Sequence, residues 1–435
     1  MDPITLGSLA FVAMLALIAL HVPIGIAMAA CGVGGFWIMT GNPAAAISML
    51  GSETATAISS QELIIIPMFL LMGAFAGASG LAGDLYHLAN ALIGHRRGGL
   101  AMATVAGCGG FGAACGSSIA TTATMARIAL PEMERRGYAQ SLGAGSIAAG
   151  GTLGSLIPPS SIMLIYAFLT EQFVVDLFIA GIVPGILTIL VYFAAIQIVV
   201  ARRPALAPSG PRQTWGVAGR TAVASWGIVL IIAIMTVGLY GGFFTVTEAA
   251  AAGTVVAFAF AVARGKLTRE NFWKVVTETA NNVGLLYMIL IGAHIFSNFI
   301  TITQMPAALV DWVTSLGLAP IAIIFVLAVI YILLGAVFDS VAAMVVTLPF
   351  VFPLVTEGLG FDPIWWGIVM IMLIEIGMIT PPIGLNVFVM HGVRKDIPLT
   401  TIFRGIMSFL AADMVRLSLV ILFPALALCL PYSMQ

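Results

Sequence analysis

A helix-breaking pattern occurs twice in this chain, at matching positions of its two halves. The first copy is Gly116-Ser117-Ser118 followed by Gly154-Ser155-Leu156-Ile157-Pro158-Pro159-Ser160, and the second is Asp339-Ser340 followed by Gly377-Met378-Ile379-Thr380-Pro381-Pro382. One offset of 223 residues (340 minus 117) superimposes one serine, one glycine and both prolines of the two copies. Paired interruptions of apolar segments are the strongest sequence indication of a transporter's binding site.

The segments that carry these breaks are strongly apolar. Of the 435 residues, 61% are hydrophobic and 8% are charged, whereas soluble domains carry about 25% charged residues. Apolar runs of roughly 20 residues recur from end to end, and such runs are typical of transmembrane helices. The sequence therefore predicts an all-α polytopic membrane protein. Its net charge of −1 gives no sign of a nucleic-acid partner, and its cysteines show no CxxC spacing.

Basic residues indicate how the chain crosses the membrane, because Lys and Arg accumulate in cytoplasmic loops. Of the 17 basic residues, only Arg127 and Arg416 fall within apolar segments in our tracing. The segment 98–130 begins and ends at basic clusters, so both its ends are expected to be cytoplasmic. The segment 319–355 has acidic flanks and no Lys or Arg, so both its ends are expected on the opposite face. Two re-entrant hairpins from opposite faces make an inverted repeat, which favours alternating access.

The same tracing divides the chain into six parts and places both termini on the periplasmic side. These parts are scaffold helices with an interfacial arm at 1–97, a first repeat core at 98–200 (hairpin 98–130, broken helix 139–170), a cytoplasmic linker at 201–220, further scaffold helices with an interfacial arm at 221–318, a second repeat core at 319–393 (hairpin 319–355, broken helix 364–390), and a C-terminal helix at 394–435. Amphipathic stretches at 43–61, 82–95 and 266–282 are expected to lie along the membrane interface.

The prolines explain how each break could bind a cation. Proline has no N–H, so two adjacent prolines free two carbonyls one turn earlier, and these carbonyls belong to Gly154 and Ser155 in the first copy and to Gly377 and Met378 in the second. Free carbonyls at membrane depth are tolerated where they line a cavity. They suit a small cation, whereas the half-helix that starts after each break presents N–H groups to an anion.

These arguments select candidate site residues. The candidate cation ligands are Ser117, Ser118, Gly154, Ser155, Pro158, Asp339, Ser340, Gly377, Thr380 and Pro381. The candidate substrate ligands are Ser160, Ser161, Asn386 and Asp339. An acid inside an apolar segment is a functional candidate by default, although Asp339 could instead cap a helix. The two serines could bond to their own helix, and Glu375, one turn before the second break, could either orient the site or pair with a neighbouring helix.

No HExxH, GxSxG or P-loop pattern is present, so the sequence supports neither hydrolysis nor nucleotide use. We therefore expect a carrier driven by an ion gradient rather than an enzyme.

With these motifs, the chain resembles the large membrane subunit of the tripartite ATP-independent periplasmic (TRAP) transporters, the DctM-like family. The resemblance covers nearly the full length and rests on Ile66 to Phe69, Gly112 to Ser118, Gly150 to Ser161 and Glu375 to Asn386. It implies a sodium-driven secondary carrier of the bacterial inner membrane, with an elevator-like motion of a transport domain against a scaffold. The family's ion and substrate sites lie at its hairpin tips and broken helices.

The resemblance also implies partners. These are a small four-helix membrane subunit, expected to be a separate polypeptide, and a periplasmic substrate-binding protein that delivers a small organic anion. A stand-alone sodium-coupled carrier of the dicarboxylate or citrate type is the alternative. An intramembrane enzyme lacks its catalytic motifs, and a purely structural scaffold leaves the two registered breaks unexplained.

Overall fold

The computed structural model describes residues 2–434, which form helices joined by short loops, with no β-strand among them. The helices of the first half are α1 (Pro3–Ala19), α2 (Ile24–Thr40), α3 (Pro43–Ser59), the short 3₁₀ helix η1 (Gln61–Ile64), α4 (Ile65–Ala78), α5 (Leu81–Ile93), α6 (Gly99–Cys115), α7 (Ser118–Arg135), α8 (Gln140–Leu156), α9 (Ser161–Thr170) and α10 (Val174–Arg202).

A connection containing the short 3₁₀ helix η2 (Pro204–Leu206) and helix α11 (Trp215–Ala224) leads into the second half. The helices of the second half are α12 (Trp226–Tyr240), α13 (Val246–Ala263), α14 (Arg269–Ile302), α15 (Met305–Ser315), α16 (Pro320–Gly335), α17 (Ser340–Pro353), the π-helical turn η3 (Leu354–Gly358), α18 (Pro363–Gly377), α19 (Leu385–Val393), α20 (Leu399–Leu422) and α21 (Ala425–Met434).

The second half repeats the first almost helix for helix. Shifted by the same 223 residues, α1, α2 and α5 to α10 begin within two residues of α12, α13 and α15 to α20, respectively. The predicted repeats are therefore confirmed, and they extend beyond the motifs to the helices that precede each hairpin. One difference breaks the correspondence, because α3, η1 and α4 in the first half match the single helix α14 in the second.

The helices differ from the predicted segments in four places. The stretch 266–282 is not a separate helix, because the 34-residue α14 runs through it from its N-cap Thr268 without a proline to stop it. Residues 215–220 of the expected linker belong to α11, and the C-terminal part contains two helices that part at Pro424. The first hairpin continues to Arg135 instead of ending at residue 130.

Among residues 2–434, six helical stretches are long and apolar enough to cross a membrane, or eight if each bent pair is one span, and two of the six join neighbouring elements (α8 with α9, and α17 with η3). The six are Gln140–Thr170, Val174–Arg202, Val246–Ala263, Arg269–Ile302, Ser340–Gly358 and Leu399–Leu422. The bent pairs are α4 with α5, at 64°, and α11 with α12, at 56°. The chain is thus a multi-pass membrane protein.

The loops that carry the basic clusters meet in space. The Ala139 N–H donates to the Leu206 carbonyl at 2.9 Å, and the Gln197 amide donates to the Arg97 carbonyl at 3.1 Å. Arg394 forms ion pairs with Glu134 at 2.7 Å and with Asp396 at 2.6 Å. Its hydrogen bond lowers the pKa of the exposed Asp396 carboxyl. Loops before α6, after α7, after α10 and after α19 therefore share one face, as charge placement predicts.

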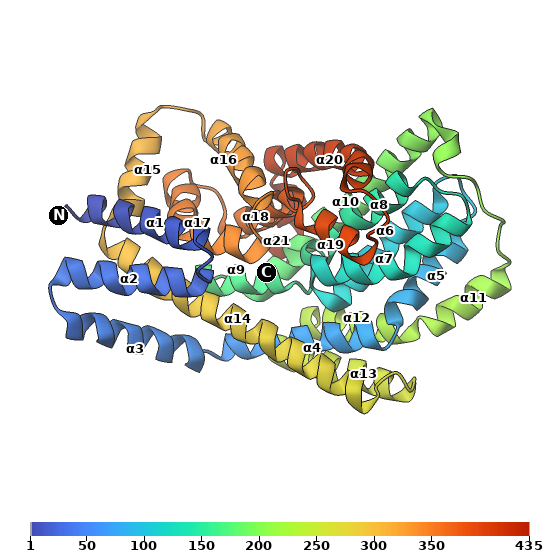
Figure 1. Ribbon diagram of the computed structural model, residues 1–435, viewed down its shortest axis with the longest axis horizontal. Coiled ribbons are helices and arrows are strands. Elements are labelled where there is room, and N and C mark those ends of the chain that lie inside the picture. The colour runs from blue at the N-terminus through green and yellow to red at the C-terminus, as the bar shows by residue number, and fades with distance from the viewer. Residues whose placement is uncertain (1, 435) are drawn as a thin grey trace.

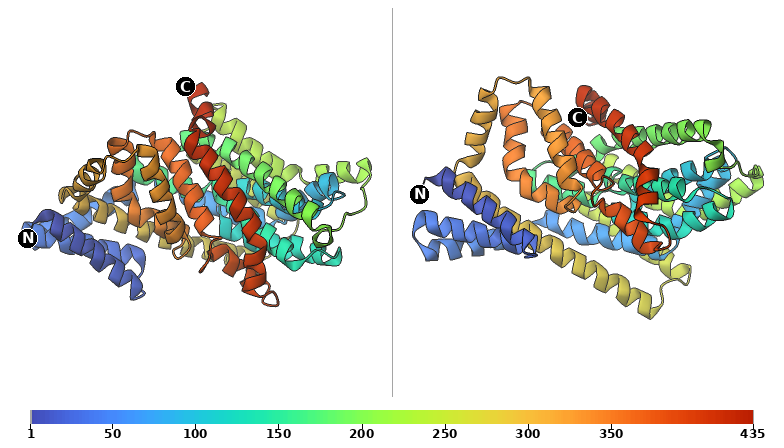
Figure 2. Two further views of the ribbon diagram at one scale, coloured as in Figure 1. Left: turned by 90° about the horizontal axis from the view of Figure 1, so that it is seen from above. Right: turned by 45° about the horizontal axis from the view of Figure 1, so that its top comes forward.

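The packing separates an outer frame from an enclosed core. Figure 1 shows the long α14 running along α2 and past α4, and α14 is in contact with both. Helices α8 and α18, equivalent in the two repeats, are buried along nearly their whole length. Figure 2 shows from two further directions that α1 to α3 lie at one end of the molecule, away from the C-terminal helices. The two broken helices thus occupy the middle of the protein.

Candidate ion and substrate site at the two breaks

The first hairpin tip (residues 116–118) packs directly against the first broken helix. A Cβ at Gly112 would lie 2.7 Å from the Gly154 Cα, so only glycine permits this approach of α6 to α8. Gly116 has φ +65°, and its carbonyl accepts hydrogen bonds from the N–H (3.2 Å) and the hydroxyl (2.9 Å) of Ser161. Ser117 caps α7 by accepting from the Ala120 N–H. The tip and the break (residues 157–160) therefore form one unit.

The second hairpin tip (residues 336–339) repeats this arrangement. A Cβ at Gly377 would lie 2.5 Å from the Gly335 Cα, and Gly335 and Gly377 are each 223 residues beyond Gly112 and Gly154. The Ala336 carbonyl at the tip accepts from the Gly384 N–H at 3.3 Å, on the far side of the second break (residues 378–384). The glycine contact that joins tip to broken helix is therefore a property of both repeats.

Contacts between the repeats bring the two units together. The Ser118 hydroxyl at the first tip lies 3.6 Å from the Met378 sulfur at the second break. The buried Asn386, at the start of α19, donates its side-chain amide to the Ala148 carbonyl of α8 at 3.4 Å. Ser118 and Met378 are 260 positions apart in the sequence. The first tip and the second break therefore meet at one place in the fold.

The two breaks differ in which carbonyls are free. Pro158 and Pro159, joined by a cis peptide bond, have no N–H to offer to Gly154 and Ser155. At the second break, which also has a cis bond between its prolines, the expectation of free carbonyls was wrong. The Gly377 carbonyl accepts from the Thr380 N–H at 2.8 Å, and the Met378 carbonyl accepts from the Asn386 N–H at 3.0 Å. The chain folds back over this break and satisfies both carbonyls.

Several candidate side chains also have structural partners. The Thr380 hydroxyl donates to the Ile376 carbonyl of its own helix at 2.6 Å, and Ser160 caps α9 by accepting from the Met163 N–H. Asp339 is exposed at the second tip and caps α17, and its Oδ1 accepts from the N–H groups of Val341 and Ala342 at 2.9 Å each. Ser340 follows it as the first residue of α17. These bonds fix the tips and breaks in place.

A cavity of about 550 Å³ reaches the first tip from the side of the basic loops. One wall is a stripe on α7 that descends from Ser117 through Thr124 to Arg127, and the other is a stripe on α14 that includes Lys274. Arg127 lies within α7, as predicted, but its side chain is exposed and makes no ion pair with any described residue. The cavity is therefore polar and carries two cationic side chains.

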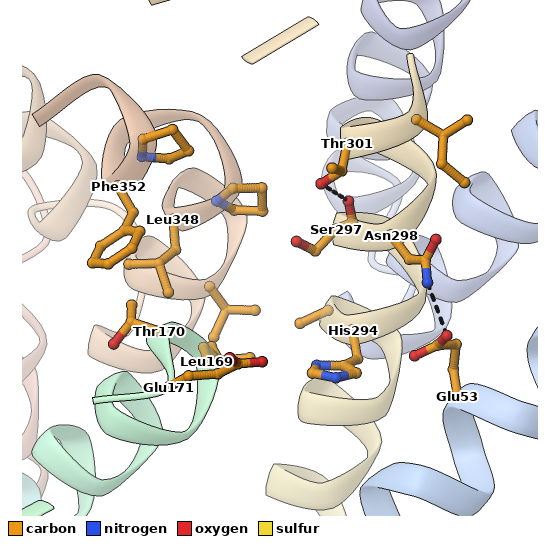
Figure 3. A pocket seen from close by; sticks show the side chains of 15 residues that line it. Glu53, Leu169, Thr170, Glu171, His294, Ser297, Asn298, Thr301, Leu348 and Phe352 are labelled. Carbon is orange, nitrogen blue, oxygen red and sulfur yellow. Dashed lines mark hydrogen bonds between the residues drawn. The ribbon is translucent and has the colours of Figure 1, made fainter. Parts of the chain in front are cut away.

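A second cavity of about 400 Å³ lies between α14 and the core helices α9 and α17. Figure 3 shows His294, Ser297, Asn298 and Thr301 of α14 on one wall and Glu171 with residues of α9 and α17 opposite. The Asn298 amide donates to Glu53 of α3 at 2.8 Å, which ties this wall to the outer frame. None of the residues that line this cavity belongs to the second tip. Of the two cavities, only the one on the basic side reaches a hairpin tip.

One group of residues was underestimated from the sequence. Glu375 is fully buried on α18, and Asp413 and Arg416 on α20 are each 1% exposed. Glu375 and Arg416 were recognised as intramembrane polar residues, but their proximity across helices required the fold. The sequence signal available was the rarity of such charges in apolar helices.

Comparison with known proteins identifies the family. Residues 11–426 match the family model described as "Tripartite ATP-independent periplasmic transporter, DctM component". The C4-dicarboxylate TRAP transporter large permease protein DctM of Pseudomonas aeruginosa is 41% identical over 85% of this chain and 86% of its own length. The ectoine/5-hydroxyectoine TRAP transporter large permease protein UehC of Ruegeria pomeroyi is 33% identical over 97% of both.

A solved structure shares the fold. The YdaH transporter of Alcanivorax borkumensis, whose topology its report describes as unusual, superimposes with a TM-score of 0.61 over 87% of both chains at 12% identity. Likeness at this identity concerns the fold alone. The family model and the relatives concern the whole chain. The protein therefore belongs to the DctM family, the large transmembrane components of tripartite ATP-independent periplasmic transporters.

Proposed function

We propose that the chain is the large subunit of a sodium-coupled importer of a small organic anion. It works in the bacterial inner membrane with a small four-helix membrane subunit and a periplasmic binding protein that delivers the anion, and both its termini are periplasmic. The two tip–break units move as an elevator against the frame formed by α2, α4, α13 and α14. Sodium is held by the carbonyls of the first break and by hydroxyls at the tips, and the carboxylate of the substrate by hydroxyls and half-helix N–H groups.

The observation that carries this proposal is the meeting of both tip–break units at one enclosed place. The first break supplies carbonyl oxygens that the prolines leave without a donor, and the half-helices after both breaks supply N–H groups. These are the requirements for binding a cation and an anion together. The contact between Ser118 and Met378 joins the repeats at that place. A structural scaffold has no need for this arrangement.

The nature of the cargo is supported by the relatives and by the cavity at the first tip. The printed names of relatives include transporters of C4-dicarboxylates, isethionate and sialic acid, all of which are acids, as well as ectoine. Arg127 and Lys274 outnumber Glu278 among the residues that line the cavity beside Ser117, and the resulting net positive charge favours an anion. Because its lining includes Arg127 and Lys274 near the basic loops, we assign the cavity to the cytoplasmic side of the membrane.

Reconstitution tests the proposal. Proteoliposomes should contain this chain and the small subunit, with the binding protein outside and loaded with the acid that it binds, for which succinate is the first probe. We expect an inward Na⁺ gradient to drive accumulation and its replacement by choline to abolish it. Uptake by this chain alone, without binding protein, would instead support the stand-alone dicarboxylate or citrate-type carrier.

The cavity makes a separate prediction about Arg127. We expect Arg127→Gln to raise the substrate concentration that gives half-maximal exchange from the cytoplasmic side by about tenfold, the equivalent of about 1.4 kcal/mol of lost charge interaction. The matched control is Arg220→Gln, which removes the same charge from the exposed connection between the halves. Equal exchange kinetics in both variants would show that the anion does not pass Arg127.

A further inference from the structure

Glu375 is an unpartnered acid at the centre of the protein. It lies on α18, one turn before the second break, and its side chain is 0% exposed. Neither of its carboxylate oxygens has a hydrogen-bond partner of ordinary geometry among the described residues, and the hydroxyl and N–H of Ser155 are the donors that approach them. A buried carboxylate in this state is strongly unfavourable unless a positive charge is nearby. Such a group is neutralised either by a bound proton or by a compensating cation.

The cationic side chain beside Glu375 is shared with a second acid. Arg416, on α20, is a charged neighbour of Glu375, but its Nη2 forms an ion pair with Asp413 at 3.1 Å. Its Nη1 donates to the Thr188 hydroxyl of α10, and the other Asp413 oxygen accepts from the Tyr192 hydroxyl at 2.8 Å. The buried group thus contains two carboxylates and one guanidinium. One positive charge is missing when both acids are ionised.

The surroundings of Glu375 are rich in oxygen atoms that belong to the other repeat. Ser155, at the end of α8, lies beside the Glu375 carboxyl, and its carbonyl receives no N–H one turn later because Pro159 has none. The neighbouring Gly154 lies against Thr121 of α7. The Thr121 hydroxyl is buried and has no hydrogen-bond partner among the described residues. Carbonyl, hydroxyl and carboxylate oxygens together are hard ligands that suit an alkali cation.

We propose that Glu375 supplies the negative charge of the cation site at the first break, acting across the two repeats. The carbonyls of Gly154 and Ser155 coordinate Na⁺, and Glu375 balances its charge from α18. Arg416 does not balance the charge of Glu375, because it forms an ion pair with Asp413. The inference rests on the proposed sodium coupling, and it adds a residue outside the tips and breaks. If Glu375 only joins α18 to α20 through Arg416, its removal will change stability but not the response to Na⁺.

Binding of Na⁺ to the purified full-length chain separates these cases without a transport assay. The melting temperature is measured in detergent at increasing NaCl, with KCl added to keep the total salt constant. We expect Na⁺ to raise the melting temperature of the unmodified protein, and Glu375→Gln to raise the half-saturating Na⁺ concentration at least tenfold. The control is Glu357→Gln, which removes an exposed acid from η3 and should leave that concentration unchanged.

Each outcome is informative. An unmodified protein that does not distinguish Na⁺ from K⁺ contradicts the sodium coupling itself. A Na⁺ response in the unmodified protein that Glu375→Gln leaves intact overturns the role of Glu375 while the coupling stands. If Glu375→Gln fails to fold, Glu375→Asp keeps the charge but withdraws it by one methylene. An unchanged half-saturating concentration in that variant also overturns the inference.

Discussion

Replacing Asp339 with asparagine should abolish Na⁺-driven uptake while the protein still folds and inserts. Asp339 is the only carboxylate at either tip, and both N–H groups that it caps are bound by Oδ1. Asparagine keeps an oxygen in that position and therefore keeps the cap, whereas the negative charge is lost. A loss of at least a hundredfold in uptake with an unchanged melting temperature would assign the effect to the charge.

Two further variants distinguish the effect of losing the negative charge of Asp339 from the effect of losing its helix cap. Asp339→Ala removes both and should lower the free energy of unfolding by about 0.5–2 kcal/mol in addition to abolishing uptake. Asp362 offers a matched control, because its Oδ1 caps α18 through two N–H groups at 2.8 and 2.9 Å but lies away from the tips. Asp362→Asn should retain uptake. Full uptake by Asp339→Asn would show that Asp339 is a capping residue and nothing more.

The repeats could be predicted from the sequence because a glycine or a proline changes the helix at its own position. The offset between Gly154 and Gly377 placed both breaks in register, and the same offset now relates nearly all helices. The fate of a freed carbonyl could not be predicted in the same way. Whether Met378 binds an ion or the N–H of Asn386 depends on how the chain returns after the prolines, and that path is set by packing around the break.

The buried acids mark a second limit. Glu375 and Arg416 were visible as charges in apolar segments, but two charges 41 positions apart (416 minus 375) carry no signal of contact in a single sequence. The helix α14 marks a third limit. Its polar first half suggested an interfacial arm, whereas in the structure that half lines the cavity beside Arg127 as part of a continuous helix. A polar helix face indicates exposure to water, and it does not distinguish the membrane surface from a cavity.

The glycine contacts between tip and broken helix predict the largest effect on stability. We expect Gly377→Val to lower the melting temperature and abolish uptake, because its Cβ would lie 2.5 Å from the Gly335 Cα and 2.6 Å from the Gly335 carbonyl carbon. These are backbone atoms that no rotamer change can move. Overpacking of this kind typically costs about 1–3 kcal/mol, and here it also forces α16 away from α18, separating the second tip from the break.

Replacement by alanine gives the sharper test, because the sign of the change in the free energy of unfolding depends on whether the glycine makes a close contact. In a helix, Gly→Ala normally stabilises by up to about 1 kcal/mol, and that is the expected result for Gly392→Ala in α19, where a Cβ would have nothing within 4 Å. Gly377→Ala should do the opposite and lower the free energy of unfolding. Gly154→Ala should behave like Gly377→Ala, since its Cβ would lie 2.6 Å from the Ser117 carbonyl oxygen. If either variant is as stable as Gly392→Ala and transports normally, that tip is not held against its broken helix, and the shared site loses its structural basis.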